Sequence, residues 1–100
     1  MDNGTQSKKG QELTNRAARI EAALRLQFSP AHLNVRDESA LHAGHSGARP
    51  EGETHYRIQM TAAAFAGQSR IAQHRAVNAA LKEEFDTGLH ALALELSAPD

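Results

Sequence analysis

Between positions 13 and 28, apolar residues recur every three or four positions and form one continuous stripe. This period predicts an amphipathic helix from Leu13 to Phe28. Thr14 is a suitable N-cap because its hydroxyl can accept a hydrogen bond from a free backbone N–H, and Pro30 disfavours helical geometry at the residue before it. The charged residues on the other faces, which we expect to be solvated rather than to bind phosphate, are Arg16, Arg19, Glu21 and Arg25.

Two segments in which apolar and polar residues alternate follow this helix. They are His32–Glu38 and Thr54–Thr61, and the two-residue period predicts a strand for each. The connecting segment Ser39–Glu53 contains three glycines and a proline, which predicts a long loop. Because the loop joins the two strands directly, we expect them to pair antiparallel. The polar face of the second strand carries His55 and Arg57, for which we expect solvent exposure rather than a ligand.

The stretch from Gly67 to Leu96 predicts a second helix followed by a third strand. Ser69 can cap the start of the helix, and Gly88 fits a helix stop with left-handed backbone. The predicted core-facing stripe consists of Ile71, Val77, Leu81 and Phe85. In the segment 89–96, His90 and three leucines share one face and alanines share the other. Both faces are therefore largely apolar, as in a strand that is covered or central in its sheet.

The order helix, strand, strand, helix, strand predicts an α+β fold in which helices cover one face of a small three-stranded mixed sheet. The last two strands should run parallel, joined by a right-handed crossover. We expect Phe65, which lies in the connection before the second helix, to join the core. Residues 1–12 form a polar tail that is predicted to be disordered, and residues 13–97 form a single domain.

The composition narrows the possible chemistry. The 100 residues include no cysteine, which excludes disulfides and thiolate metal ligands. The net charge is −1 with neutral histidines, which argues against avid nonspecific DNA binding. No apolar run approaches the roughly 20 residues of a membrane span, and the polar N-terminus is not a secretory signal. We therefore expect a soluble cytoplasmic protein without membrane contact. Six histidines in so short a chain are the unusual feature.

Two of these histidines, His42 and His45, lie in the predicted loop, where imidazoles can reach a metal supplied from elsewhere. The alternative is a mobile loop with two solvated histidines. A self-contained catalytic zinc site needs three protein ligands and an oriented base. The helical His-Glu-x-x-His signature is absent, so we do not expect a hydrolytic zinc enzyme. His74 lies within the apolar arc of the second helix, either as a half-buried histidine or as a functional contact.

An ordered set of short motifs along the chain resembles the BolA family. These motifs are Asp37-Glu38-Ser39 followed by His42, Glu53-Thr54-His55-Tyr56-Arg57, Phe65-Ala66-Gly67, His74-Arg75, Asn78 with Leu81-Lys82-Glu83-Glu84, and His90-Ala91-Leu92-Ala93. Together they cover the chain from Ile20 to Leu96. The resemblance implies a fold similar to the type II KH domain and two roles for such a protein.

The first implied role is a non-enzymatic partnership with a monothiol glutaredoxin that carries a Cys-Gly-Phe-Ser motif. A 2Fe–2S cluster bridges the heterodimer, with the glutaredoxin cysteine and glutathione on one side; none is held tightly by the BolA-like chain alone. The resemblance assigns His90 and the loop residue His42 as ligands here, with His45 as a local alternative. Imidazole can replace thiolate on one iron of a 2Fe–2S centre, as in Rieske sites. Such a protein acts in iron–sulfur cluster assembly, trafficking or iron sensing.

The second implied role is that of a DNA-binding transcriptional regulator of stress response and cell morphology. The residues that would carry it are Arg70, His74, Arg75, Lys82 and Arg57. The chain lacks the Gly-x-x-Gly loop with which KH domains clamp a nucleic-acid backbone. It also has Gln73 where the family has the first arginine of an Arg-His-Arg motif. We therefore rank DNA binding second, and the sequence leaves homodimerisation open.

Overall fold

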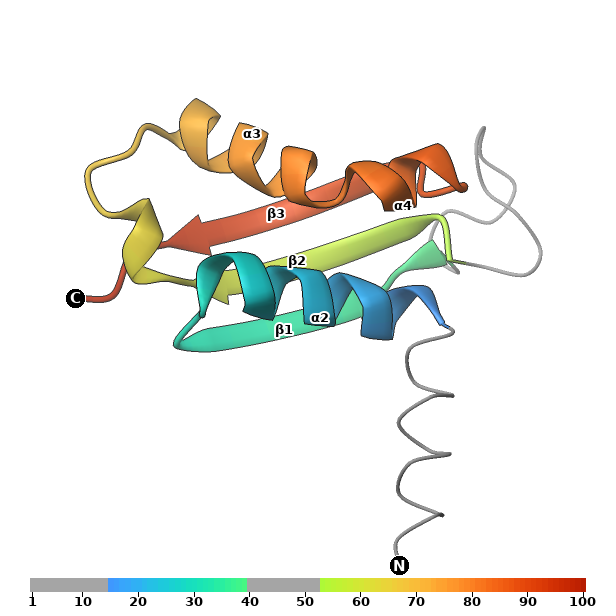
Figure 1. Ribbon diagram of the computed structural model, residues 1–100, viewed down its shortest axis with the longest axis horizontal. Helices are drawn as coiled ribbons and strands as arrows, with labels where there is room; N and C mark the ends of the chain where they lie inside the picture. The colour runs from blue at the N-terminus through green and yellow to red at the C-terminus, as the bar shows by residue number, and fades with distance from the viewer. Residues whose placement is uncertain (1–14, 40–52) are drawn as a thin grey trace, which may run out of the picture.

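A three-stranded mixed sheet carries the helices of the described chain on one of its faces (Figure 1). The structure is a computed structural model that describes residues 15–39 and 53–100. Its elements are α2 (Arg16–Phe28), β1 (His32–Asp37), β2 (His55–Thr61), the short 3-10 helix η2 (Ala63–Phe65), α3 (Arg70–Ala80), α4 (Lys82–Asp86) and β3 (Ala91–Ser97). This order confirms the predicted α+β class and the predicted sequence of strands and helices.

The strands are arranged in the order β1-β2-β3, with β2 in the centre. β1 pairs antiparallel with β2, and β2 pairs parallel with β3, so both predicted pairings are confirmed. In the parallel pair, His55 lies opposite Ala91, which places the beginnings of β2 and β3 at the same end of the sheet. β3 lies at an edge of the sheet, although its apolar residues are also compatible with a central strand. Its leucines pack against the core on the side of the helices, and its alanines lie on the other face.

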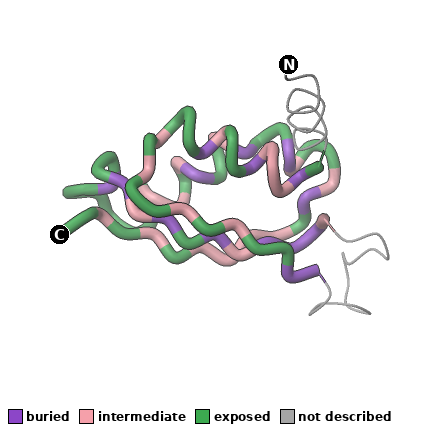
Figure 2. The backbone as a smooth tube through the Cα atoms, turned by 90° about the horizontal axis from the view of Figure 1, so that it is seen from below, coloured by how far each residue is buried: buried purple, intermediate pink, exposed green. Residues whose placement is uncertain are grey.

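The core lies between the sheet and the two longer helices, as the buried positions in Figure 2 show. Its fully enclosed members include Ile20, Leu24, Ile58 and Phe65, none more than 1% exposed. The ring of Phe65 lies 5.2 Å from that of Phe28 at the end of α2, measured between centroids. The prediction that Phe65 joins the core is therefore confirmed. Burying one such side chain stabilises a fold by about 1.5–3 kcal/mol relative to leaving it exposed.

Two expectations about α2 are wrong. The N-cap is Asn15, whose side-chain oxygen accepts a hydrogen bond from the N–H of Ala18 at 2.8 Å, whereas the predicted cap, Thr14, is outside the described residues. The expectation that the charged residues of α2 are solvated is also wrong in part. Arg16 is only 6% exposed, because a distant carboxylate draws its guanidinium inward, as described below. Glu21 and Arg25, in contrast, form an exposed ion pair of 3.0 Å, as expected of a surface helix.

The predicted second helix is interrupted at Leu81, which separates α3 from α4 and has φ −107° and ψ 20°. Ser69 caps α3 as predicted and accepts a hydrogen bond from the N–H of Ala72 at 3.1 Å. Val77 and Leu81 are buried, but Ile71 is 64% exposed, contrary to the expected stripe. Periodicity identifies the face of a helix and not how far that face extends over the sheet. Ile71 is the second residue of α3, at the end of the apolar stripe.

The face of the sheet opposite the helices, here called the open face, carries a ladder of polar side chains. Arg57 bridges Glu38 at 3.0 Å and Glu95 at 2.7 Å. Gln59 donates to the same Glu95 at 2.9 Å and accepts from Asn34 at 3.2 Å. Hydrogen bonds from Gln59 and Arg57 lower the pKa of Glu95, although desolvation opposes the shift. Each charge on this ladder therefore has an opposite charge beside it.

None of the helices in the described ranges is both long enough and apolar enough to cross a membrane.

The different burial of Leu81 and Ile71 generates a stability prediction. Leu81→Ala should lower the free energy of unfolding by about 2–5 kcal/mol, because it leaves a cavity at a position that is 1% exposed. Ile71→Ala should change it by no more than about 0.5 kcal/mol, as is usual for exposed positions. Urea denaturation of both variants measures the two values. Equal losses in the two variants would contradict the assigned faces of α3.

Candidate functional site

His90 lies at the end of the sheet where β2 and β3 begin, and it is exposed to solvent. Its backbone N–H donates to the carbonyl of Thr54 at 2.8 Å, and the N–H of Ala91 donates to the same oxygen at 3.1 Å. The side chain of His90 makes no hydrogen bond within the described ranges, so an exposed imidazole stands on an anchored backbone. The sequence predicted His90 at the junction where the third strand starts, and β3 begins one residue later, at Ala91.

Ser39 joins the two chain segments that flank residues 40–52. Its hydroxyl accepts hydrogen bonds from the N–H of Thr54 at 3.0 Å and from the N–H of His55 at 3.1 Å. The N–H of Glu38 also donates to the carbonyl of His55 at 2.7 Å. Ser39 and Thr54 are buried, so these bonds are shielded from competing water. The chain therefore leaves the sheet and returns to it at one place, directly beside the backbone that holds His90.

Asp37 strengthens this junction with its carboxylate, which accepts from the N–H of Ser39 at 2.8 Å and from the N–H of Glu53 at 3.3 Å. Desolvation raises the pKa of Asp37, but hydrogen bonds from Ser39, Glu53 and Tyr56 outweigh it, and the pKa lies below its ordinary value. Burial raises the pKa of the neighbouring Tyr56, and the charges of Asp37 and Glu53 add to that effect. Tyr56 therefore stays neutral beside an ionised Asp37.

His55 contributes a second imidazole to this end of the sheet. Its ring centroid lies 5.3 Å from that of His90, with an angle of 49° between the ring planes. Its Nδ1 lies 2.9 Å from the hydroxyl of Thr54. His55 is 7% exposed, so the expectation of a solvated side chain is wrong. The parallel register places His55 opposite Ala91, the residue after His90. Knowledge of this register would have identified His55 as a neighbour of His90.

The two loop candidates, His42 and His45, lie outside the described residues. The covalent chain nevertheless limits their distance from the anchored junction. His42 follows Ser39 by three residues, which span at most about 10 Å when fully extended. Since Ser39 binds Thr54, and Thr54 binds the backbone of His90, a loop imidazole within reach of His90 is compatible with chain length.

Comparison with known proteins supports the family resemblance that the motifs of this chain indicate. A family model described as BolA-like protein matches residues 24–100. The chain belongs to the BolA-like family. A Sinorhizobium protein, described as an uncharacterized protein in the cobS 5′ region, is 51% identical to this BolA-like chain over 81 residues, with 80% of this chain and 87% of that protein covered. Protein BOLA1, chloroplastic, of Arabidopsis thaliana is 38% identical over 89 residues, which cover 87% of this chain but 56% of the longer relative.

Solved structures show the same family fold. The BolA domain of SufE1 from Arabidopsis thaliana superposes with a TM-score of 0.77 at 37% identity, over 84% of this chain and 92% of that domain. Yeast Fra2 superposes with a TM-score of 0.54 at 28% identity, over 80% of this chain and 71% of the other. The resemblance drawn from the motifs and the predicted BolA-like fold are therefore confirmed.

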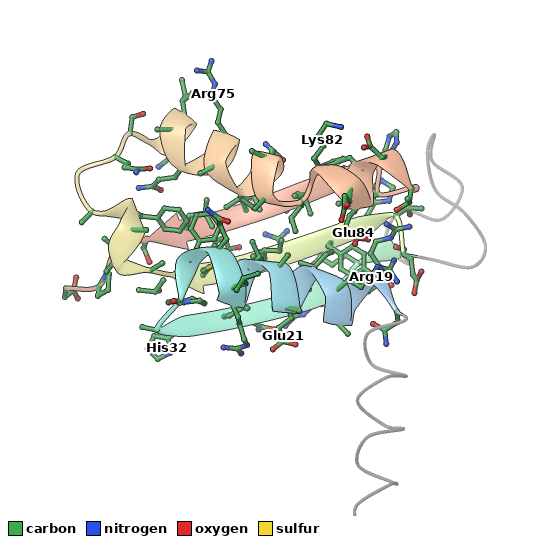
Figure 3. The ribbon with its side chains drawn as sticks, viewed as in Figure 1. Arg19, Glu21, His32, Arg75, Lys82 and Glu84 are labelled. Carbon is green, nitrogen blue, oxygen red and sulfur yellow. The ribbon has the colours of Figure 1, made fainter. Side chains whose placement is uncertain are left out.

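The cationic candidates of this BolA-like chain do not gather on one face. Arg70 and Arg75 are exposed on α3, and Lys82 is exposed on α4, where it pairs with Asp86 at 3.0 Å. Figure 3 shows Arg75 and Lys82 on the helices. Arg57 lies on the open face, on the other side of the sheet, between two carboxylates. His74, the remaining member of the set, is half-buried on α3. Three of the cations are thus exposed on the helices, whereas Arg57 lies on the other side of the sheet.

Within residues 15–39 and 53–100, no group of three or more histidine, cysteine, aspartate or glutamate side chains is arranged to hold a metal ion.

The lowered pKa of Asp37 generates a pH prediction. Its ionised form is favoured by folding, so its contribution to stability is complete above the unfolded pKa of about 3.9 and is lost as the pH falls through the lower folded value. Asp37→Asn should therefore be less stable than the parent protein at pH 7, and this difference should shrink below pH ~4. Urea denaturation across this range measures it. Asp86→Asn, at an exposed carboxylate, is the control; a constant Asp37→Asn difference would contradict the prediction.

Proposed function

We propose that this BolA-like chain is a non-enzymatic partner of a monothiol glutaredoxin and co-ligates a bridging 2Fe–2S cluster. The observation that carries the proposal is the exposed imidazole of His90, held at the junction from which the segment with His42 and His45 departs. The cluster is shared cargo. The chain would act in iron–sulfur cluster assembly, trafficking or iron sensing.

The chemistry of the ligands supports this proposal. A chain without cysteine can ligate a 2Fe–2S cluster through imidazole, while the partner's cysteine and glutathione provide thiolates. Nitrogen ligands on one iron raise the reduction potential of such a cluster relative to thiolates. His90 is a suitable fixed ligand because its backbone and that of Ala91 share one carbonyl acceptor, Thr54. A second imidazole from the following loop, His42 or His45, completes the proposed set.

The role of His90 generates a spectroscopic prediction. His90→Ala should change the visible absorption and circular dichroism of the cluster reconstituted with the organism's own monothiol glutaredoxin, because one iron loses its imidazole. Docking of the two apo proteins, measured by calorimetry, should be unchanged. His32→Ala is the matched control, since His32 is also exposed but pairs with Thr61, at the opposite end of β2 from His55 (Figure 3).

The loop histidines are tested in the same reconstitution. His42→Ala and His45→Ala, separately and together, identify which imidazole serves as the second ligand. If the spectrum is the same as that of the parent complex in both His90→Ala and the His42→Ala/His45→Ala double variant, these ligands are ruled out.

DNA binding is the second candidate, and the exposure of Arg70 and Arg75 on one helix favours it. Two phosphate contacts predict a slope of about −2 for the logarithm of the binding constant against that of salt concentration. Arg70→Gln/Arg75→Gln should abolish this binding, whereas Arg57→Gln, on the open face, should leave it unchanged. Fluorescence anisotropy with labelled duplexes measures both effects. Micromolar or tighter binding that discriminates promoter from random duplex would place this role first.

A further inference from the structure

Arg16 connects the beginning of α2 to the turn that precedes His90. Its Nη1 donates to the Glu84 carboxylate at 2.7 Å, to the Glu84 carbonyl at 3.0 Å and to the Thr87 hydroxyl at 3.1 Å. Its Nη2 donates to the Thr87 carbonyl at 3.0 Å. One guanidinium therefore binds two backbone carbonyls that lie 68 and 71 residues away in the sequence. The Glu84 carbonyl belongs to α4, and the Thr87 carbonyl belongs to the turn that leads from α4 into β3.

The backbone on both sides of His90 is fixed by these contacts. The Glu84 carbonyl that Arg16 binds also accepts the N–H of Leu89 at 2.9 Å, which closes the turn. Leu89 is 4% exposed and belongs to the core. Only Gly88 and Leu89 separate the bound Thr87 carbonyl from His90, whose own N–H is held by Thr54. Gly88 has φ +127°, a conformation that L-residues rarely adopt and that glycine adopts without a steric clash.

The other flank of His90 also lies next to Arg16. The backbone N–H of Arg16 is 3.5 Å from the carboxylate of Glu53, the residue that precedes Thr54. The start of α2 therefore contacts the segment before Thr54 and the turn before His90. Both segments border the backbone of His90, one through the Thr54 carbonyl and the other through Leu89.

The guanidinium of Arg16 binds two backbone carbonyls through Nη1 and Nη2 but leaves one of its own donors without an acceptor in the described part of the chain. Its Nε is buried and has no hydrogen-bond partner among the described residues. Such a group is uncommon in a folded protein and calls for an explanation. Glu84 receives a second cation, since Arg19 Nε lies 3.0 Å from its other carboxylate oxygen (Figure 3). A buried pair of this kind is weak evidence for stability, because apolar replacement of both partners is often neutral.

We propose that Arg16 and Glu84 are positioning residues for His90, which hold the turn between α4 and β3 so that the imidazole stands beside His55 at the solvent-exposed end of the sheet. The effect of this positioning on the cluster rests on the proposed function. The effect on the His90 ring in the isolated chain is independent of the proposed function. The planar fork of arginine is required, because the single ammonium of lysine cannot bind the Glu84 carboxylate and the Thr87 carbonyl in the same way.

The experiment uses the full chain with Arg16→Met/Glu84→Met, which removes both buried charges together and fills their volume. Two-dimensional NMR of the apo protein reports the NOE between the His55 and His90 rings and the exchange protection of the His90 N–H. We expect the NOE to be lost and the protection to fall at least about tenfold, because the turn opens locally. The amide shifts of residues 56–61 in β2 should stay unchanged, which shows that the fold persists.

A second variant, Arg16→Lys, separates charge from position and keeps the test decisive if the double variant fails to fold. Lysine preserves the charge pair with Glu84 but lacks the fork, so we expect the melting temperature to be retained and the ring NOE to be lost. The control is Glu21→Gln/Arg25→Gln, which removes an exposed ion pair of 3.0 Å within α2 and should change neither the melting temperature nor the ring NOE. A parent-like NOE and parent-like protection in a folded Arg16 variant would overturn the proposal.

The reconstituted complex provides the last arm. We expect the visible circular dichroism of Arg16→Lys to shift in the direction seen for His90→Ala, while apo docking stays intact. If His90→Ala leaves the spectrum unchanged, the proposed function fails, and the NMR result still decides whether Arg16 positions the ring. If His90→Ala changes the spectrum and Arg16→Lys does not, although its NOE is lost, the positioning of His90 has no role in ligation.

Discussion

The carbonyl of Thr54 is the acceptor on which the arrangement of the site depends. It binds the N–H groups of His90 and Ala91, at 2.8 and 3.1 Å, and so sets where β3 begins relative to β2. Thr54 is itself held by the Ser39 hydroxyl. A parallel pair has no tight turn to fix its register, so hydrogen bonds at the first residues take over that task. The same bonds place His90 at the end of the sheet where β2 and β3 begin.

The periodic features of the fold were predictable, because the period of apolar residues reports local geometry. The strand segments, the parallel and antiparallel pairings and the buried Phe65 follow from alternation, loop length and hydrophobicity. The choice of Asn15 over Thr14 as N-cap was not predictable, since both residues cap helices well. Ile71 was misplaced because its exposure depends on where the apolar stripe of α3 ends over the sheet.

The site was less accessible to sequence reasoning than the fold. His90 was identified through the family motif, since a lone histidine at a strand end has no distinguishing period. His55 was expected to be exposed, because the alternation of polar and apolar residues places it on the polar face of the strand. This alternation contains no information about the neighbouring segments that bury His55. Arg16 was assigned to a solvated face for a related reason. Its partner Glu84 lies 68 residues away, and only the packing of α2 beside α4 brings the two charges together.

The polar ladder on the open face affects how a partner meets this molecule. Arg57 stands between Glu38 and Glu95, and the amides of Asn34 and Gln59 extend the same chain of contacts. Neighbouring charges of opposite sign generate only a weak electric field at a distance. The open face therefore offers an incoming protein little electrostatic guidance. A protein that approached the open face would therefore meet charges of opposite sign side by side rather than a field of one sign.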